Sequence, residues 1–447
     1  ILLALLFPSP SRSFSFLIHR PPSLSRLIKF MSQSSITPII DTNSADKNRR
    51  KRAPSKKVLD VKNESDGEDL EPSSKLQKTT SIVPRDTIVP KEFSSSESQF
   101  RIMSWNVNGF TALTKKLPVF VDLVEKYKPD VLCLQETKLQ SNAVNDFIDV
   151  LPDYKSFWHC STVKKGYSGT AVFIRKDIEI NAPNGFLSSN SIKSEVNDKA
   201  VVGKAKKQSK LSSMWAKKET NDVEKPQDPN ESSSSTSNLK KREGIKVEKI
   251  SYDFEDEGPN PFTGEGRTIT VEFDKFFFVC CYVPNSGEGL VRLDYRVNEW
   301  DPHVRSYLQA LSARKPIIFG GDMNVGHLDA DIHNPTAKHI SKQAGLTPRE
   351  RESFSQLLAT PSNGHTFVDA FRFFHPDAKG QFTYWSQRTF ARKDNRGLRL
   401  DYFICSGDLF PHSSGGEGGP QVVDSFIVHE DTLGCSDHCP IMLTMRI

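Results

Sequence analysis

The sequence predicts an α+β fold in which two packed, mixed β-sheets are flanked by helices. Two observations lead to this prediction. Short apolar runs typical of buried strands recur from about residue 98 to the end of the 447-residue chain, and helix-like segments lie between them. The hydrophobic fraction is 36% and the mean hydropathy is −0.48. These values indicate that part of the chain is disordered, while the rest is long enough to bury a large core.

The strands are expected where apolar runs stop at a turn signal, as residues 101–105 do before Asn108-Gly109. Two helices are expected at residues 117–127, where Lys128-Pro129 ends the helix, and from about 292 to 313. A third opens at Thr347-Pro348-Arg349-Glu350, with Thr as cap and Glu as capping-box partner. The other predicted strands are residues 131–134, 171–174, 268–273, 276–283, 316–319, 400–405 and 441–445.

Three stretches lack this periodicity. Residues 1–30 are rich in Ser, Pro, Arg and Leu and contain no Asp or Glu, which is typical of an organelle transit peptide; untranslated upstream sequence, with Met31 as the start, explains them equally well. Residues 31–97 are predicted to be a disordered tail. Residues from about 187 to 248 are predicted to be a disordered insertion within a single domain, 98–447, because strand signals resume directly after it.

Charge and cysteine content restrict the class of protein. The net charge of +5 is compatible with a polyanionic partner, and the basic cluster at residues 47–57 predicts nuclear localisation or a nucleic-acid-binding arm, with a solvated charge run as the alternative. We expect the protein to be located in the nucleus, or in a chloroplast or mitochondrion if residues 1–30 are a transit peptide. The seven cysteines include no C-x-x-C pair and are interpreted as reduced core residues of an intracellular protein. A zinc site from Cys435, His438 and Cys439 would lack a second ligand pair. No stretch approaches the roughly 18 apolar residues of a membrane helix.

Acidic, amide or histidine side chains lie at the ends of four predicted strands. Any one of them alone is more often a turn or cap residue. Together they predict a polar site at one rim of the sheets, because strand ends that are distant in sequence can meet there. The residues concerned are Asn106, Asn108, Glu136, Asp322, Asn324, Asp437 and His438.

These residue types fit the hydrolysis of a phosphodiester. Carboxylate and amide oxygens such as those of Glu136 and Asn108 suit Mg²⁺, with Mn²⁺ as a substitute. Asp322 can orient or deprotonate a water molecule. A histidine held by a carboxylate can stabilise charge on the phosphate, and Asp401 and His438 are the expected pair.

Eight blocks of sequence, taken in order, resemble the exonuclease III-type apurinic/apyrimidinic endonucleases of the endonuclease/exonuclease/phosphatase superfamily, and within it a eukaryotic, plant-like member. The resemblance spans about residues 98–447, with only the insertion unmatched. The blocks are residues 104–109, 134–138, 166–170, 265–267, 282–287, 321–325, 399–403 and 436–440.

The resemblance implies a four-layer, DNase I-like α/β-sandwich and incision of DNA 5′ to an abasic site, leaving a 3′-hydroxyl and a 5′-deoxyribose phosphate in base excision repair. It implies a monomer acting on double-stranded DNA with abasic or 3′-blocked sites, with other repair proteins binding through the tail. The implied catalytic residues are Asn106, Tyr282, Asp322, Asn324, Asp401 and His438. The implied metal ligands are Asn108, Glu136, Asp322, Asn324, Asp437 and His438, of which Glu136 is the principal one. The implied DNA contacts are Lys138, Tyr167, Asn285, Trp385 and Leu398.

Three positions depart from the family pattern. Phe110-Thr111 follows Gly109 where many members have Leu-Arg, so one basic DNA contact is expected to be missing. Glu288 stands where some animal members carry an intercalating Arg, and its carboxylate would repel phosphate. Leu398 replaces a Trp that would wall the pocket for the flipped-out sugar together with Tyr384 and Trp385, so a wider and less discriminating pocket is expected.

Three other functions compete with abasic-site incision. A 3′-phosphodiesterase or 3′–5′ exonuclease would use the same chemistry with a different seating of DNA. A sibling such as an inositol-phosphate phosphatase or a sphingomyelinase would share the catalytic groups, but the blocks at 166–169 and 399–402 favour DNA. A non-catalytic interaction protein would be expected to lose Glu136, Asp322 or His438, which are all present.

Overall fold

The computed structural model describes residues 82–93, 99–181, 242–255, 261–362, 365–411, 419–429, 432 and 434–447. The segment predicted for residues 1–30, the basic cluster at 47–57 and nearly all of the predicted insertion lie outside the described residues. Within the described ranges, no helix is both long and apolar enough to cross a membrane.

The first sheet has six strands in the order β13-β14-β1-β2-β4-β3. Its centre is the parallel pair β1 (Gln99–Asn106) and β2 (Val131–Gln135), and its other neighbours are antiparallel. Because β1 and β2 run in the same direction, the residues that follow both strands lie at one edge of the sheet. The remaining strands are β3 (Tyr154–His159), β4 (Thr170–Arg175), β13 (Gln421–Ile427) and β14 (Ile441–Arg446).

The second sheet has eight strands in the order β10-β11-β12-β9-β8-β7-β6-β5. Its centre repeats the arrangement of the first: β8 (Phe277–Tyr282) and β9 (Ile317–Asp322) are parallel, and β12 (Asp401–Ser406) pairs antiparallel with β9. The start of β12 therefore lies beside the end of β9. The other strands are β5 (Glu179–Ile180), β6 (Lys246–Tyr252), β7 (Thr268–Phe273), β10 (Pro361–Ser362) and β11 (His365–Asp369).

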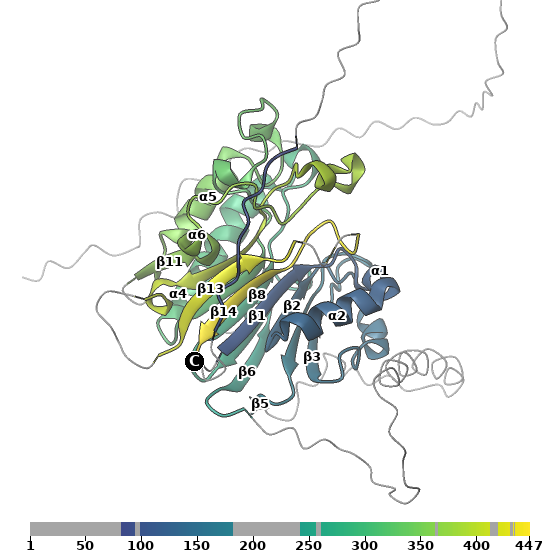
Figure 1. The fold of residues 1–447 in the computed structure, drawn as a ribbon, viewed down its shortest axis with the longest axis vertical. Coiled ribbons are helices and arrows are strands. Elements are labelled where there is room, and N and C mark those ends of the chain that lie inside the picture. Colours follow the sequence, from purple (N-terminus) through teal and green to yellow (C-terminus); the bar gives the residue numbers. More distant parts are fainter. Residues whose placement is uncertain are drawn as a thin grey trace, which may run out of the picture. The chain divides into compact units, whose positions relative to one another are not determined.

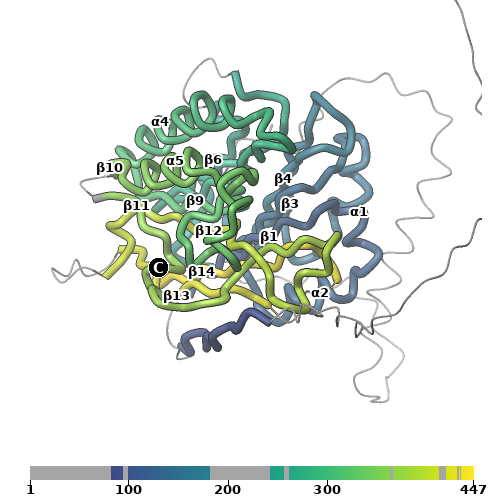
Figure 2. Tube along the Cα trace, turned by 90° about the horizontal axis from the view of Figure 1, so that it is seen from above, coloured from purple at the N-terminus to yellow at the C-terminus, as the bar shows by residue number. Residues whose placement is uncertain are grey.

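The two sheets pack face to face and helices cover their outer faces, which gives four layers (Figures 1 and 2). In β1, Ile102 belongs to the core between the sheets, whereas Met103 belongs to the core under helix α2 (Leu117–Tyr127). In β8, Phe278 lies between the sheets and Phe277 lies under helix α4 (Asp301–Ser312). Alternate residues of these strands thus enter different apolar cores, which explains why a central strand such as β8 is apolar at every position. The predicted fold class is confirmed.

Local sequence signals set the helix boundaries. Helix α2 (Leu117–Tyr127) ends at Lys128, which is left-handed at φ 45° and donates its N–H to the carbonyl of Val124. Helix α5 (Pro348–Leu358) has the predicted capping box: the Glu350 N–H donates to Thr347 Oγ1 over 3.2 Å, and the Glu350 carboxylate accepts from the Thr347 N–H. Two shorter helices are α1 (Phe110–Leu113) and α6 (Ala370–Phe374).

The helix predicted from about residue 292 to 313 has two parts. Residues Tyr295–Trp300 form a π-helix, and α4 (Asp301–Ser312) continues from it. Pro302 explains the change, because it has no N–H to donate to the carbonyl four residues earlier. The wider turn buries Arg296 and Trp300 beside the second sheet.

Several short elements escaped prediction, and one predicted boundary is wrong. Strands β3, β5, β6, β10, β11 and β13 were not expected from the sequence. The predicted end of the insertion near residue 248 is too late, because β6 starts at Lys246. The consecutive side chains of Glu248 and Lys249 in β6 are exposed, so this strand has no continuous apolar run.

The disordered tail predicted for residues 31–97 is also wrong at its C-terminal end. Residues 82–93 form an extended segment that packs on the domain beside β13 and β14 (Figure 1). The Val83 N–H donates to the Asp394 carbonyl, and the Asp86 N–H donates to the Lys379 carbonyl. Gln381 Nε2 donates to the Asp86 carbonyl over 2.6 Å. We call residues 82–93 the strap.

Gly380 lies directly against the strap. Its φ is +67°, and a Cβ added to it would lie 2.1 Å from the Pro84 carbonyl oxygen. Gly166 has nearly the same φ, +66°, but a Cβ there would meet nothing within 4 Å. The two glycines therefore differ in contact with the strap but not in backbone conformation.

We expect Gly380→Ala to destabilise the protein more than Gly166→Ala. The left-handed backbone costs each variant about 1–2 kcal/mol. The clash with Pro84 adds about 1–3 kcal/mol to Gly380→Ala only, or displaces the strap. Denaturant unfolding of both variants, with proteolysis of the strap followed in parallel, measures the difference. Equal stability and equal protease resistance would contradict the observed contact.

Candidate active site

The ends of the central strands bring the predicted residues to one edge of the two sheets. Tyr282 ends β8, Asp322 ends β9 and Asp401 begins β12. The strand registers pair Tyr282 with Asp322 and Asp322 with Asp401, so these three lie in one row. Asn106 ends β1 and Glu136 directly follows β2 in the facing sheet. The sequence-based prediction that these strand ends converge is confirmed by this geometry.

A cleft of about 580 Å³ opens above this row. It is polar and is lined by four carboxylates, from Glu136, Glu288, Asp322 and Asp437. Lys342 and Arg388 also line the cleft and carry positive charge, and Tyr384, Leu398 and Leu400 give it an apolar side. A cleft with this concentration of negative charge can bind a phosphate only if cations neutralise the carboxylates.

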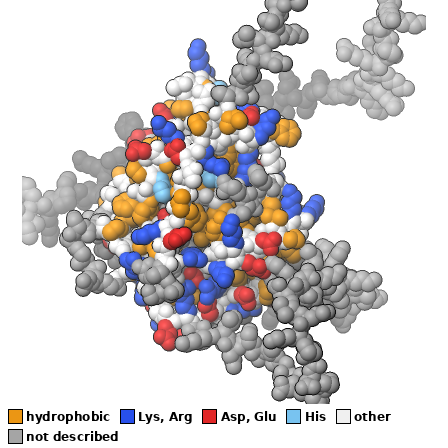
Figure 3. All heavy atoms as spheres, in the orientation of Figure 1, with side chains coloured by type: hydrophobic (Ala, Val, Ile, Leu, Met, Phe, Trp, Pro, Cys, Tyr) orange, Lys and Arg blue, Asp and Glu red, His pale blue; other side chains and the backbone are white. Residues whose placement is uncertain are grey.

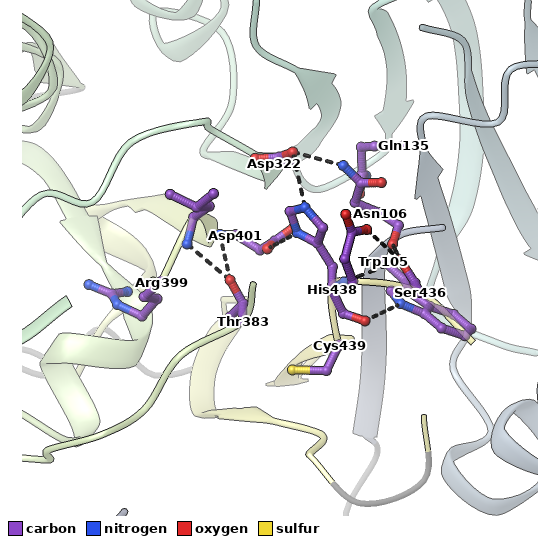
Figure 4. A network of polar contacts seen from close by, with 12 residues as sticks. Trp105, Asn106, Gln135, Asp322, Thr383, Arg399, Asp401, Ser436, His438 and Cys439 are labelled. Atoms are coloured by element: carbon purple, nitrogen blue, oxygen red, sulfur yellow. Dashed lines mark hydrogen bonds and ion pairs between the residues drawn. The ribbon is translucent and has the colours of Figure 1, made fainter. Parts of the chain in front are cut away.

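His438 lies at the floor of the cleft and is held from several directions (Figure 4). Its Nδ1 is 2.8 Å from Asp401 Oδ2, and its Nε2 is 3.9 Å from Asp322 Oδ2. Its carbonyl accepts from Trp105 Nε1 over 3.2 Å, and its ring packs 5.0 Å from that of Tyr384. Burial lowers the pKa of His438, but Asp401, Asp322 and Asp437 outweigh burial and raise it to about 10. The imidazole is therefore charged at neutral pH and points its Nε2 toward Asp322.

Asp322 is buried and accepts two hydrogen bonds. Asn106 Nδ2 donates to its Oδ2 over 2.8 Å, and the Asn324 N–H donates to its Oδ1 over 2.9 Å. Burial, followed by the negative charge of Asp401, raises the pKa of Asp322 to about 7, against the opposing effect of His438. A carboxyl with this pKa can take up a proton near neutral pH, which is the property of a general base.

Glu136 is the centre of a second cluster. Its Oε1 accepts from Asn106 Nδ2 over 3.0 Å and from the Tyr282 hydroxyl over 2.8 Å. Its Oε2 is 2.8 Å from the Lys138 ammonium, which also donates to Asn108 Oδ1 over 2.5 Å. Burial raises the pKa of Glu136, but Lys138 and the hydrogen bonds outweigh it, so the net pKa is lowered. Glu136 is ionised at neutral pH.

The donors present fit a hard divalent cation. Glu136 and Asn108 turn oxygens toward one positive group, the Lys138 ammonium, and Asp437 lies in the same cleft. Asp322, Asp401 and His438 also have possible ligand atoms within 4.8 Å of one another. Oxygen donors of this kind suit Mg²⁺ or Mn²⁺. Cys439 instead lies with its sulfur 4.0 Å from His429 Nδ1, away from the cleft, which removes the zinc alternative that needed Cys435, His438 and Cys439.

Some of the predicted DNA-contacting residues line the cleft and others lie outside its lining. Asn285 lines the cleft and donates to Asn324 Oδ1 over 2.8 Å, and Leu398 lines it as part of a small apolar cluster. Tyr167 lies outside the lining, where its hydroxyl accepts from Arg267 and Arg292 over 2.6 Å each. Lys138 has a partly exposed side chain, but its ammonium is engaged by Glu136 and Asn108.

The prediction that Trp385 walls the pocket is wrong. Trp385 is 2% exposed and belongs to the core between the sheets, with its Nε1 donating to Asn395 Oδ1 over 3.2 Å. Its neighbour Tyr384, which was predicted to wall the pocket as well, does line the cleft, because consecutive residues of an extended segment point to opposite sides. Trp385 supports the site through its backbone N–H, which donates to the Asp437 carbonyl over 2.9 Å.

Three further residues of the site were not predicted from the sequence. Thr383 Oγ1 accepts from the N–H groups of Leu400 and Asp401 over 3.0 and 3.1 Å and so fixes the start of β12. Lys342 and Arg388 line the cleft from short 3₁₀ helices, Ile340–Lys342 and Gln387–Thr389. No local pattern marks these three residues, because only the tertiary fold brings each of them to the site.

The arrangement matches known proteins. Residues 103–438 match the Endonuclease/Exonuclease/phosphatase family. This chain belongs to that family. The family assignment agrees with the resemblance found in the eight sequence blocks.

Individual relatives of the Endonuclease/Exonuclease/phosphatase family cover most of the chain. The "DNA repair nuclease APEX1" of Danio rerio is 34% identical over 362 residues, which are 80% of this chain and 87% of that protein. The "Exodeoxyribonuclease" of Bacillus subtilis is 32% identical over 348 residues, which are 78% of this chain and all of that protein. The crystal structure of the AP endonuclease LMAP from Leishmania major superposes with a TM-score of 0.56 at 28% identity, covering 82% of this chain and 93% of that one.

We expect Asp401→Asn to lower the pKa of His438 from about 10, because the variant removes the strongest opposition to burial. A raised pKa stabilises the folded protein fully below the ordinary value of about 6.5 and less as the pH rises toward 10. In the variant, His438 should therefore lose its proton at a lower pH than in the wild type. The stability that the charged imidazole contributes should be lost at that lower pH as well. NMR titration of the histidine ring protons from pH 5 to 10.5 measures this.

Asp424→Asn is the matched control, because Asp424 is a buried carboxylate in β13 that binds the strap at Lys91. It should leave the titration of His438 unchanged. Titration of His438 at the same pH in wild type and Asp401→Asn would contradict the assigned pair.

Proposed function

We propose that this protein is a Mg²⁺-dependent DNA repair phosphodiesterase that incises the DNA backbone 5′ to an abasic site. The single observation that supports this most strongly is the position of His438 between Asp401 and Asp322, beside Glu136, at the floor of a cleft open to solvent. The relatives named as a DNA repair nuclease, an exodeoxyribonuclease and an AP endonuclease support DNA as the substrate.

The protein's own groups account for attack, charge stabilisation and orientation. Asp322, with a pKa raised to about 7, accepts the proton of the water that attacks phosphorus. The His438 imidazolium donates a hydrogen bond to a phosphate oxygen as negative charge develops there, and Asp401 holds its ring. The bond from phosphorus to the 3′-oxygen breaks and the leaving oxygen takes up a proton from solvent, so the products are a 3′-hydroxyl and a 5′-deoxyribose phosphate.

The remaining residues hold this arrangement. Asn106 bridges the two halves, because its Nδ2 donates to both Asp322 and Glu136. Tyr282 fixes Glu136, and Asn324 fixes Asp322 through its N–H and Asn285 through its side chain. A bound Mg²⁺, held by Glu136 and Asn108 with Asp437 nearby, would supply positive charge to the phosphate and to the leaving oxygen. Burial of Asp322, Asn324 and His438 restricts the water that can reach the reacting phosphate.

A 3′-end-cleaning phosphodiesterase is the second candidate. It is favoured by Leu398, which gives the cleft an aliphatic side where the family commonly has an indole. Such a cleft would discriminate less between an abasic sugar and other 3′ groups. Both candidate functions use the same catalytic groups. They differ in the DNA substrate that binds in the cleft, which is an abasic site in one case and a blocked 3′ end in the other.

We expect the full-length protein to cut a labelled duplex 5′ to a single abasic site with Mg²⁺ and not with EDTA. Undamaged duplex and a nick with a 3′-phosphate are the parallel substrates, and Glu136→Ala controls for contaminating nucleases. Cleavage only of the 3′-blocked nick would establish the second candidate. If every DNA remained intact under these conditions, both would be rejected.

Asp322→Asn and His438→Asn should each slow single-turnover cleavage by about 10³-fold or more, because each removes a group that acts on the reacting phosphate. DNA affinity should change by less than about threefold, since neither residue is a main source of binding. His339→Asn, an exposed histidine on the loop before Ile340, is the matched control. Near-normal rates in either catalytic variant would refute the assigned roles.

A further inference from the structure

The Lys138 ammonium lies where the proposed metal ligands point. It is 2.8 Å from Glu136 Oε2 and 2.5 Å from Asn108 Oδ1. The other oxygen of Glu136 is already engaged by Asn106 and Tyr282. Glu136 Oε2 and the Asn108 amide oxygen are thus the two oxygens that can bind one cation together. In this structure that cation is the Lys138 ammonium.

The backbone around this pair is fixed. Asn108, Glu136 and Lys138 are all left-handed, with φ of 48°, 52° and 54°. The Gly109 N–H donates to the Glu136 carbonyl over 2.7 Å, and the Lys138 N–H donates to the Ser168 carbonyl over 2.8 Å. Such a conformation persists only where the surroundings hold it. The oxygens are therefore preorganised, and the flexible four-carbon stem of Lys138 is the part that can move.

The Lys138 ammonium and a divalent metal ion cannot occupy this place together, because both are positively charged. Asn108 is neutral, so the single positive charge of Lys138 balances the single negative charge of Glu136. A divalent ion held by the same two oxygens would lie next to the ammonium and repel it strongly at this distance. The metal can bind here only when the ammonium leaves. The side chain of Lys138 is 33% exposed, which gives it a route toward the solvent.

We propose that Lys138 is a positioning residue that competes with the divalent metal for Glu136 and Asn108 and, once displaced, binds a phosphate of the DNA. The metal part concerns the free protein, and the DNA part rests on the proposed function. Displacement converts a cation that weakens metal binding into one that strengthens DNA binding. Metal and DNA are therefore positively coupled, each raising the affinity for the other by the same factor.

The first test measures Mn²⁺ binding to the full-length protein without DNA, from the EPR signal of free Mn²⁺. Lys138→Met keeps the apolar stem and removes the charge, and it should bind Mn²⁺ about tenfold more tightly than wild type. Lys342→Met is the matched control, because Lys342 lines the same cleft without an observed contact to Glu136 or Asn108 within the described residues. It should change Mn²⁺ affinity by less than about twofold. Equal or weaker Mn²⁺ binding by Lys138→Met would overturn the proposal.

The second test measures the coupling with DNA in an Asp322→Asn background, which prevents cleavage during the measurement. Fluorescence anisotropy gives the affinity for a duplex with a tetrahydrofuran abasic-site analogue, with Mn²⁺ and with EDTA. Mn²⁺ should raise the affinity about tenfold with Lys138 present and less than about twofold in Lys138→Met. Equal enhancement in both proteins would overturn the role on DNA. A failure of the wild type to cut any DNA, with the Mn²⁺ result as expected, would reject only the proposed function.

Discussion

The position of β9 between β8 and β12 is the constraint on which the site depends. Its parallel register with β8 and antiparallel register with β12 place Tyr282, Asp322 and Asp401 in one row. Packing of the two sheets then sets this row opposite the ends of β1 and β2, which carry Asn106 and Glu136. A shift of one residue in either register would turn Asp322 to the opposite face of the sheet and away from His438.

Each carboxylate at the site has a neighbouring group that compensates its charge. Asp401 faces His438, Asp322 accepts from Asn106 and Asn324, and Glu136 faces Lys138. Below the row, the fully buried Arg399 spans two carboxylates, 2.8 Å from Asp331 and 2.6 Å from Asp369. This ion network fixes the residues directly before β12. Removing one partner from such a network leaves an uncompensated buried charge, which is the costly event.

On the face shown in Figure 3, Lys and Arg side chains are interspersed with acidic and hydrophobic ones. The charges that raise the pKa of His438 come from its neighbours at the site, Asp401, Asp322 and Asp437. The strap contributes from the back of the same region, because Asn395 donates to the Val83 carbonyl and accepts from Trp385, whose N–H holds Asp437. The N-terminal segment is thus connected to the cleft through three residues.

The sequence by itself determined the central strands, helix α2, the capping box of α5 and the identity of most polar residues at the site. These features depend on periodicity and capping within a few neighbouring residues. Only the tertiary structure decided that Trp385 is buried, that Lys138 lies between Glu136 and Asn108, and that the strap packs on the domain. The Trp105 indole, for example, meets His438 across 333 positions of sequence. Such contacts follow from strand register and sheet packing, which leave no local pattern in the chain.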